Sequence, residues 1–404
     1  MRPLRHSLRN LLPDGLRARY HEYALRRDFG IDRRKGTRRP ALLDPRLPQG
    51  LNVVGYFGSP SGVGQSARAI ASAAEEAGEA IARIEASSVR RSDQTGAPYD
   101  VNLYHVNADA AAAVVEELGS RAHAGRANIA YWYWETEKFP GTWRDRFDYF
   151  DEVWVASEYC RKTIEAVSPL PVVVVPPAVT LPTIHDFSAD PSYPSFRFLT
   201  VFDALSVPER KNPLGTIRAF ARAFPDPSSA SLLVSVSNAE RVPGLSRAMR
   251  EAAGSARVLI LEEEAVRSGM AAQFSACDAY VSLHRAEGFG FPIAEAMSLG
   301  KPAIATDYSG SADYLDETTG FPVRWKPMTL SERIRDYEAG TTWAEPDEAH
   351  AVETLRRVVS DRGEAARRAE AGRRRVAALY GPSAVGAKVR AQLQALRARL
   401  GKSS

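Results

Sequence analysis

The feature that most constrains the fold is an alternation of short apolar segments with helical segments, which runs along most of the chain and restarts once. Short apolar runs bounded by turn residues predict strands, and apolar residues at helical spacing predict helices between them. A first series of predicted strands lies at residues 51–57, 80–84, 101–106, 128–133, 153–156 and 172–175. After a Pro- and Ser-rich stretch that ends at Pro194, a second series lies at residues 196–202, 231–236, 258–261, 279–283 and 302–305. Strands that alternate with helices form parallel sheets, so the sequence predicts an α/β protein with two Rossmann-like domains in series.

The length of the chain agrees with this division, because 404 residues exceed one ordinary domain. We expect a basic N-terminal arm and linker at 1–50, an N-terminal domain at 51–185 and a C-terminal domain at 186–375. Residues 376–404 are expected to form a closing C-terminal helix.

The positive charge of the chain is concentrated in its first 40 residues. They contain 12 Lys and Arg against 4 Asp and Glu, whereas the whole chain has a net charge of +4, so the remaining 364 residues carry −4. Such an arm favours peripheral contact with anionic lipid head groups, or is simply solvated, and nucleic acid is the less favoured partner. No apolar run approaches the ~20 residues of a membrane span, and residues 1–30 lack the apolar core of a signal peptide. Two distant cysteines also favour a reducing compartment, so we expect a cytoplasmic location.

The most informative motif contains two glutamates eight positions apart, Glu287 and Glu295. Glu287 follows a predicted strand, and Gly288 and Gly290 allow a ligand to approach the backbone closely. Glu295 lies in the first turns of a predicted helix, where outward N–H groups suit a phosphate. Two carboxylates in this arrangement can flank one ligand and accept hydrogen bonds from sugar or ribose hydroxyls.

This stretch resembles the E-x7-E signature of retaining GT-B glycosyltransferases, in particular family 4, also called glycosyl transferases group 1. The resemblance continues through residues 300–310. It implies two domains that face each other across a cleft, with a nucleotide-diphosphate sugar as donor. It also implies that Glu287 lies beside the transferred sugar and Glu295 binds the donor ribose. The backbone of Gly288, Phe289 and Gly290 would then contact sugar hydroxyls or the diphosphate.

A second group of candidate residues, Arg210 and Lys211, lies between a predicted strand and a predicted helix, where ligands collect in α/β proteins. The family that the chain resembles usually has an arginine about five positions before its lysine, and both contact the diphosphate. Ser206 is at that earlier position in this chain, and Arg210 adjoins the lysine instead. Whether Arg210 reaches the phosphate or points elsewhere is therefore open at this point.

The first glycine-rich loop allows two interpretations. Its Gly62 and Gly64 resemble the loop that faces the cleft in GT-B glycosyltransferases and helps to hold phosphates or acceptor. The same residues fit the G-x-G-x-x-A dinucleotide fingerprint, with Glu85 about 20 residues later, which would indicate a nicotinamide or flavin enzyme. The loop from Gly58 to Gly62 is longer than the tight turn of a dinucleotide-binding site, so we favour the glycosyltransferase interpretation.

Three polar residues of the N-terminal half are weaker candidates for sugar or acceptor contacts: Glu135 after an aromatic strand end, and His105 and Asn107 at the end of the third predicted strand. For each of them, a purely structural role is the competing interpretation.

The prediction is a retaining, metal-independent glycosyltransferase (a hexosyltransferase) that needs no cofactor, because the sequence has no convincing Asp-x-Asp metal site. The donor would be a nucleotide-diphosphate sugar and the acceptor a glycan or a lipid-linked glycan, in polysaccharide biosynthesis. The alternatives are a non-catalytic sugar-nucleotide-binding protein and an oxidoreductase or epimerase that uses the Gly62–Gly64 loop.

Overall fold

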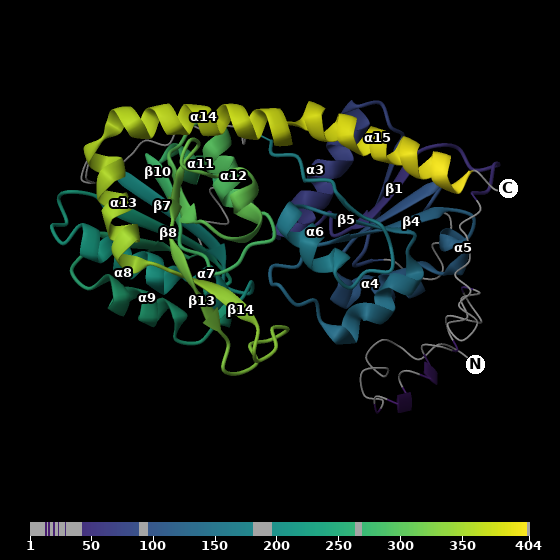
Figure 1. Ribbon diagram of the computed structural model, residues 1–404, viewed down its shortest axis with the longest axis horizontal. Coiled ribbons are helices and arrows are strands. Elements are labelled where there is room, and N and C mark those ends of the chain that lie inside the picture. The colour runs from purple at the N-terminus through teal and green to yellow at the C-terminus, as the bar shows by residue number, and fades with distance from the viewer. Residues whose placement is uncertain are drawn as a thin grey trace.

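The protein consists of two α/β domains side by side (Figure 1), as seen in a computed structural model. The structure describes residues 43–88, 96–180, 196–262 and 269–401, together with residues 13, 15, 16, 19, 20, 23 and 29. The basic arm at 1–40 therefore lies almost wholly outside the described residues, as does most of the Pro- and Ser-rich stretch before Pro194.

The N-terminal domain is built on a six-stranded parallel sheet with strand order β2-β1-β3-β4-β5-β6. Its central strands are buried along their whole length, as expected when helices cover both faces of a parallel sheet. The strands are β1 (Leu51–Gly55), β2 (Ile81–Glu85), β3 (Val101–His105), β4 (Ala127–Trp132), β5 (Glu152–Val155) and β6 (Val172–Val174). The helices are α3 (Gly62–Glu76), α4 (Ala108–Leu118), α5 (Ser120–His123), η3 (Gly141–Tyr149) and α6 (Glu158–Glu165).

The C-terminal domain repeats this design around a second parallel sheet with order β12-β11-β10-β7-β8-β9. Its strands are β7 (Arg197–Asp203), β8 (Ser231–Ser237), β9 (Val258–Leu261), β10 (Ala279–Ser282), β11 (Ala303–Thr306) and β12 (Phe321–Val323). Its helices up to β12 are α7 (Pro208–Lys211), α8 (Pro213–Ala223), η4 (Ala239–Arg241), α9 (Leu245–Ala253), α11 (Gly269–Ser275), α12 (Phe291–Ser298) and η5 (Ser309–Asp313).

Both sheets have a topological switch point, where ligands bind in open α/β folds. In the N-terminal sheet it lies between β1 and β3, and in the C-terminal sheet between β7 and β10. The loops that carry Gly62 and Gly64, Arg210 and Lys211, and Glu287 follow strands at these switch points, whereas Glu135 follows β4.

The sequence analysis did not predict an antiparallel hairpin that is inserted after β12. It consists of β13 (Trp325–Thr329) and β14 (Thr342–Pro346). Its strands are short and carry prolines and charged residues, so no clear alternation of apolar residues marks them. In Figure 1 the hairpin lies at the side of the C-terminal domain that faces the N-terminal domain.

The end of the chain returns to the N-terminal domain. After α13 (Glu348–Ser360), helix α14 (Arg362–Tyr380) runs along the C-terminal domain and α15 (Pro382–Leu400) along the N-terminal domain (Figure 1). The break falls at Gly381-Pro382, because proline starts a helix well but cannot continue one. Helix α15 packs on α3 so closely that a Cβ on Gly386 would lie 2.2 Å from the Ala73 carbonyl oxygen. In the described part of the chain, no helix is long and apolar enough to cross a membrane.

Candidate functional site

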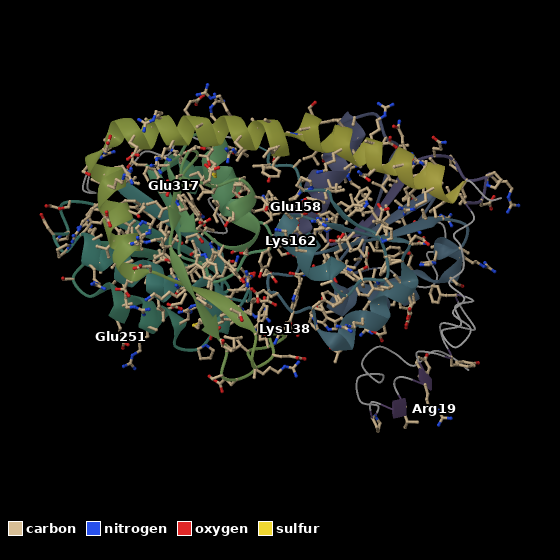
Figure 2. All side chains as sticks on the ribbon, in the orientation of Figure 1. Arg19, Lys138, Glu158, Lys162, Glu251 and Glu317 are labelled. Atoms are coloured by element: carbon tan, nitrogen blue, oxygen red, sulfur yellow. The ribbon has the colours of Figure 1, made fainter. Side chains whose placement is uncertain are left out.

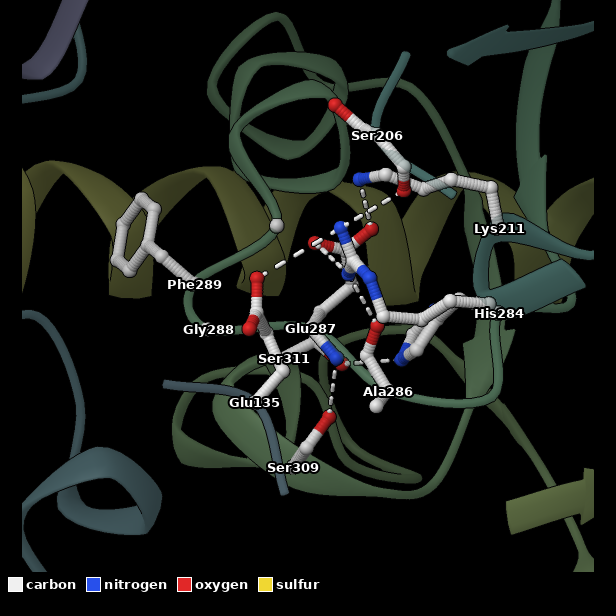
Figure 3. A network of polar contacts seen from close by, with 12 residues as sticks. Glu135, Ser206, Lys211, His284, Ala286, Glu287, Gly288, Phe289, Ser309 and Ser311 are labelled. Atoms are coloured by element: carbon white, nitrogen blue, oxygen red, sulfur yellow. Dashed lines mark hydrogen bonds and ion pairs between the residues drawn. The ribbon is translucent and has the colours of Figure 1, made fainter. Parts of the chain in front are cut away.

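The site lies between the two domains, at the carboxyl ends of the C-terminal strands. Three loops converge there: the loop from β7 to α7, the loop from β10 to α12, and the segment from β11 to η5 (Figure 3). Because β10 lies between β7 and β11, these loops are neighbours in space although they are far apart in sequence.

Lys211 and Glu287 contact each other directly at the centre of this region. The Lys211 ammonium donates to Oε1 of Glu287, and Nη1 of Arg210 lies 3.5 Å from Oε2 of the same carboxylate. Burial opposes ionisation of this carboxyl, but the charges of Lys211 and Arg210 outweigh it and lower the pKa of Glu287 to about 2. Glu287 is therefore an anion at neutral pH, paired with the buried Arg210 and the partly buried Lys211.

Arg210 points inward rather than toward solvent, and its side chain is only 6% exposed. It donates to the carbonyl oxygens of Ala286 at 2.6 Å and Ser206 at 3.2 Å. Its Nη2 also lies 3.6 Å from Oε1 of Glu135, which comes from the N-terminal domain. Nε of Arg210 is buried without a hydrogen-bond partner among the described residues. The guanidinium therefore has one buried N–H without a partner, while its other nitrogens contact Ala286, Ser206, Glu287 and Glu135.

Asn212, which the sequence analysis did not single out, explains how the chain presents these two cations. Helix α7 has a single turn, and Asn212 ends it in the left-handed conformation (φ 54°). Its side chain then caps α8 by accepting from the Gly215 N–H, and donates to the Leu283 carbonyl oxygen at 2.8 Å. The turn is thus fastened to the loop that carries Glu287.

Glu295 lies on α12 and faces the N-terminal domain. Its Oε1 accepts a hydrogen bond of 2.5 Å from Nε2 of Gln65, and its Oε2 is buried without a described partner. Burial raises the pKa of Glu295 to about 7, and the single bond from Gln65 offsets this only in part. Gln65 was not a sequence candidate, although it directly follows Gly64.

The backbone from Gly288 to Gly290 is buried, and its shape depends on the neighbouring loop. Ser309 adopts a positive φ of 66°, and its hydroxyl accepts from the Glu287 N–H at 2.8 Å. Gly310 packs so tightly that a Cβ there would lie 2.2 Å from the Gly288 carbonyl oxygen. The N–H groups of Gly288, Phe289 and Gly290 donate to no acceptor within the part of the chain that the structure describes. They lead directly into the N-terminus of α12, where an anion is favoured.

The first loop approaches this region through the start of α3. Ser61 caps the helix by accepting from the Gly64 N–H at 3.3 Å. Gly64 is required sterically, because a Cβ there would lie 2.5 Å from two carbonyl oxygens, whereas a Cβ on Gly62 would meet nothing within 4 Å. The carboxylate of Glu85 is bound within the loop, where it accepts from the Gly58 N–H at 2.9 Å.

The three weaker candidates differ in position. His105 is fully buried, stacks on Tyr131 and lies 2.8 Å from the Ser66 hydroxyl, and burial lowers its pKa to about 3. Oδ1 of Asn107 accepts from the Tyr133 N–H at 3.0 Å. Of the three, Glu135 alone is placed by the structure against Arg210.

Comparisons with known proteins identify the family segment and the fold that this chain resembles. The family described as Glycosyl transferases group 1 matches residues 207–338, about a third of the chain. Sucrose-phosphate synthase from Thermosynechococcus elongatus matches with a TM-score of 0.64 at 16% identity, covering 87% of this chain and all of that one. A glycosyltransferase from Rickettsia africae gives 0.63 at 14% identity, covering 88% of this chain and all of that one. The chain has the GT-B fold.

HepE from Anabaena, solved in complex with UDP and glucose, is a further structural neighbour of this GT-B protein. It matches with a TM-score of 0.60 at 15% identity, over 86% of this chain and 100% of that chain. No curated protein is detectably similar in sequence. The family match contains Arg210, Lys211, Glu287 and Glu295. The resemblance to group 1 glycosyltransferases is therefore confirmed for this segment and for the fold, and the family match supports sugar transfer.

Proposed function

We propose that this protein transfers a sugar from a nucleoside-diphosphate sugar to a hydroxyl acceptor, with retention at the anomeric carbon and without a metal ion. One observation carries the proposal. Within the matched family segment, the buried Arg210, the partly buried Lys211 and Glu287 adjoin N–H groups before a helix N-terminus that have no partner among the described residues. Buried positive charge beside free N–H groups suits a diphosphate.

The donor would lie along the carboxyl ends of β7 and β10. Lys211 and Arg210 bind the diphosphate. Arg210 takes the role of the arginine that the family usually has at the position of Ser206. The free oxygen of Glu295 accepts from a ribose hydroxyl, which explains why a buried carboxylate keeps an unpaired oxygen. Glu287 and the backbone at 288–290 contact the transferred sugar.

The reaction exchanges two bonds at the anomeric carbon on the same face of the sugar. The bond to the leaving phosphate oxygen breaks, the bond to the acceptor oxygen forms, and the acceptor proton passes to the leaving phosphate. Lys211, Arg210 and the N–H groups stabilise the charge that develops on the diphosphate, the contribution that usually dominates such catalysis. Glu287 orients the donor and stabilises positive charge on the sugar, and no covalent intermediate on it is invoked.

The acceptor would approach from the N-terminal domain. We assign Glu135 to an acceptor hydroxyl, because it lies beside Arg210 and close to Gly288. His105 and Asn107 would act indirectly, because they bind Ser66 and the backbone of Tyr133, which lies two positions before Glu135. The acceptor is proposed to be a glycan or a lipid-linked glycan. A cytoplasmic enzyme whose basic residues 1–40 contact an anionic membrane would meet such an acceptor at the lipid surface.

The test is donor turnover by Lys211→Ala and Glu295→Ala, with Glu251→Ala as a control, because Glu251 is exposed on α9 (Figure 2). A panel of UDP-, GDP- and dTDP-sugars first identifies the donor by thermal shift, since a bound ligand raises stability by mass action. With that donor, we expect each site variant to lose about 100-fold or more in kcat/KM and the control to keep wild-type turnover. Normal turnover by both site variants would refute the assignment.

A further inference from the structure

The loop of the β13–β14 hairpin, residues 330–341, reaches the N-terminal domain beside the donor site. The ring of Tyr337 lies 5.4 Å from that of Trp134, and the Lys138 ammonium lies 3.4 Å from the Gly340 carbonyl oxygen. Figure 2 shows Lys138 at the junction of the two domains. The hairpin is also fastened to the donor-site loop, because Arg285 pairs with Glu345 at 2.5 Å.

The two oxygens of Glu135 are shared between this loop and the donor site. Oε2 accepts from the Tyr337 hydroxyl at 3.2 Å, while Oε1 lies 3.6 Å from Nη2 of Arg210. A charge-assisted hydrogen bond between a guanidinium and a carboxylate is normally about 2.7–2.9 Å long. The Glu135–Arg210 pair is therefore held short of full contact, and Arg210 keeps its buried, unpartnered Nε.

We propose that Tyr337 is a positioning residue that restrains Glu135 and so keeps the Arg210 guanidinium available for the donor diphosphate. Without the Tyr337 hydroxyl, Glu135 is free to turn both oxygens toward Arg210. A bidentate pair would form, and the carboxylate would compete with the diphosphate for the same donors. Because Glu135 and Tyr337 come from different domains, this restraint operates only when the cleft is closed.

This inference rests on the proposed function, so the test measures binding of a nucleoside diphosphate rather than turnover. The full chain is titrated by calorimetry with UDP, and with GDP and dTDP if UDP does not bind. Tyr337→Phe keeps the aromatic packing and removes only the hydroxyl. We expect it to weaken binding about tenfold, the effect of one hydrogen bond to a charged group.

The decisive variant is the double substitution Tyr337→Phe with Glu135→Gln. A neutral glutamine cannot compete for Arg210, so this variant is expected to recover wild-type affinity. The matched control is Tyr159→Phe. The Tyr159 hydroxyl forms a hydrogen bond of 2.7 Å with the Tyr308 hydroxyl across the same domain junction, and this bond does not involve Glu135. It is expected to bind UDP as the wild type does.

Three results would overturn the proposal: equal affinity in the wild type and Tyr337→Phe, a loss in Tyr337→Phe that Glu135→Gln does not restore, or an equal loss in Tyr159→Phe. The last would mean that any bond across the junction matters equally. If the wild type binds none of the three nucleotides, the proposed donor itself is wrong, which separates failure of the function from failure of this inference.

Discussion

The burial of Glu295 has a consequence for stability that can be measured. Its pKa is about 7 in the folded protein against an ordinary value of 4.5, because one oxygen is buried without a partner. The folded state therefore binds a proton between pH 4.5 and 7 that the unfolded state has released. The free energy of unfolding must therefore fall as pH rises through this window. The expected decrease is about 3 kcal/mol, because one pKa unit corresponds to roughly 1.4 kcal/mol.

We expect Glu295→Gln to remove this pH dependence, because the amide has no proton to lose. Urea unfolding of the wild type and the variant at pH 5 and pH 8 measures the difference. At pH 8 the variant should be the more stable protein, and at pH 5 the two should be similar. An identical pH dependence in both would show that Glu295 titrates normally.

Charged residues within sequence motifs were predictable as site residues. Residues that matter because they contact the other domain were not. The loops between predicted strands and helices carry motifs that point to Glu287, Lys211 and Arg210. The structure brings these three side chains together. Gln65 and Tyr337 contact residues more than 200 positions away, so their partners follow only from how the domains meet. No local pattern in the sequence encodes that contact.

At the scale of elements, the contact between the 287–290 loop and η5 leaves no room for a larger side chain. Gly310→Ala would place a Cβ 2.2 Å from the Gly288 carbonyl oxygen, so the two loops must separate. We expect donor turnover to fall about tenfold or more while the fold is retained, since misplacement of a site by about 1 Å can cost ~100-fold in rate.

The control for this substitution is Gly141→Ala, because a Cβ at Gly141 meets nothing within 4 Å. Circular dichroism and kcat/KM with the identified donor are measured for both variants. Full activity in Gly310→Ala would mean that the close approach of the two loops does not shape the site.

Most elements of the two sheets followed from the sequence, because buried parallel strands appear as short apolar runs. The hairpin did not, since β13 and β14 are short, proline-containing and partly exposed. The division of the tail into α14 and α15 is marked locally by Gly381-Pro382, but nothing local indicates that α15 packs on the N-terminal domain.

At the scale of the whole molecule, two basic segments are candidates for contact with an anionic membrane. Residues 1–40 carry an excess of +8, and residues 362–401 contain 10 Lys and Arg against 2 Asp and Glu. Part of the second group is compensated by carboxylates of the body of the protein. Arg375 pairs with Asp316, Arg397 with Asp100 and Arg399 with Glu152. The N-terminal arm is therefore the better candidate for contact with anionic lipid.

We expect the full chain to sediment with phosphatidylcholine vesicles that contain phosphatidylglycerol, and not with phosphatidylcholine alone. Deletion of residues 1–40 should abolish this, because each cation near an anionic surface contributes roughly 1 kcal/mol. Added NaCl should release the full chain, since exposed charges are screened. The deleted chain must still bind the donor nucleotide, which shows that it is folded. If it sediments as well as the full chain, the arginines of α14 and α15 provide the contact instead, and their ion pairs with the body do not neutralise them.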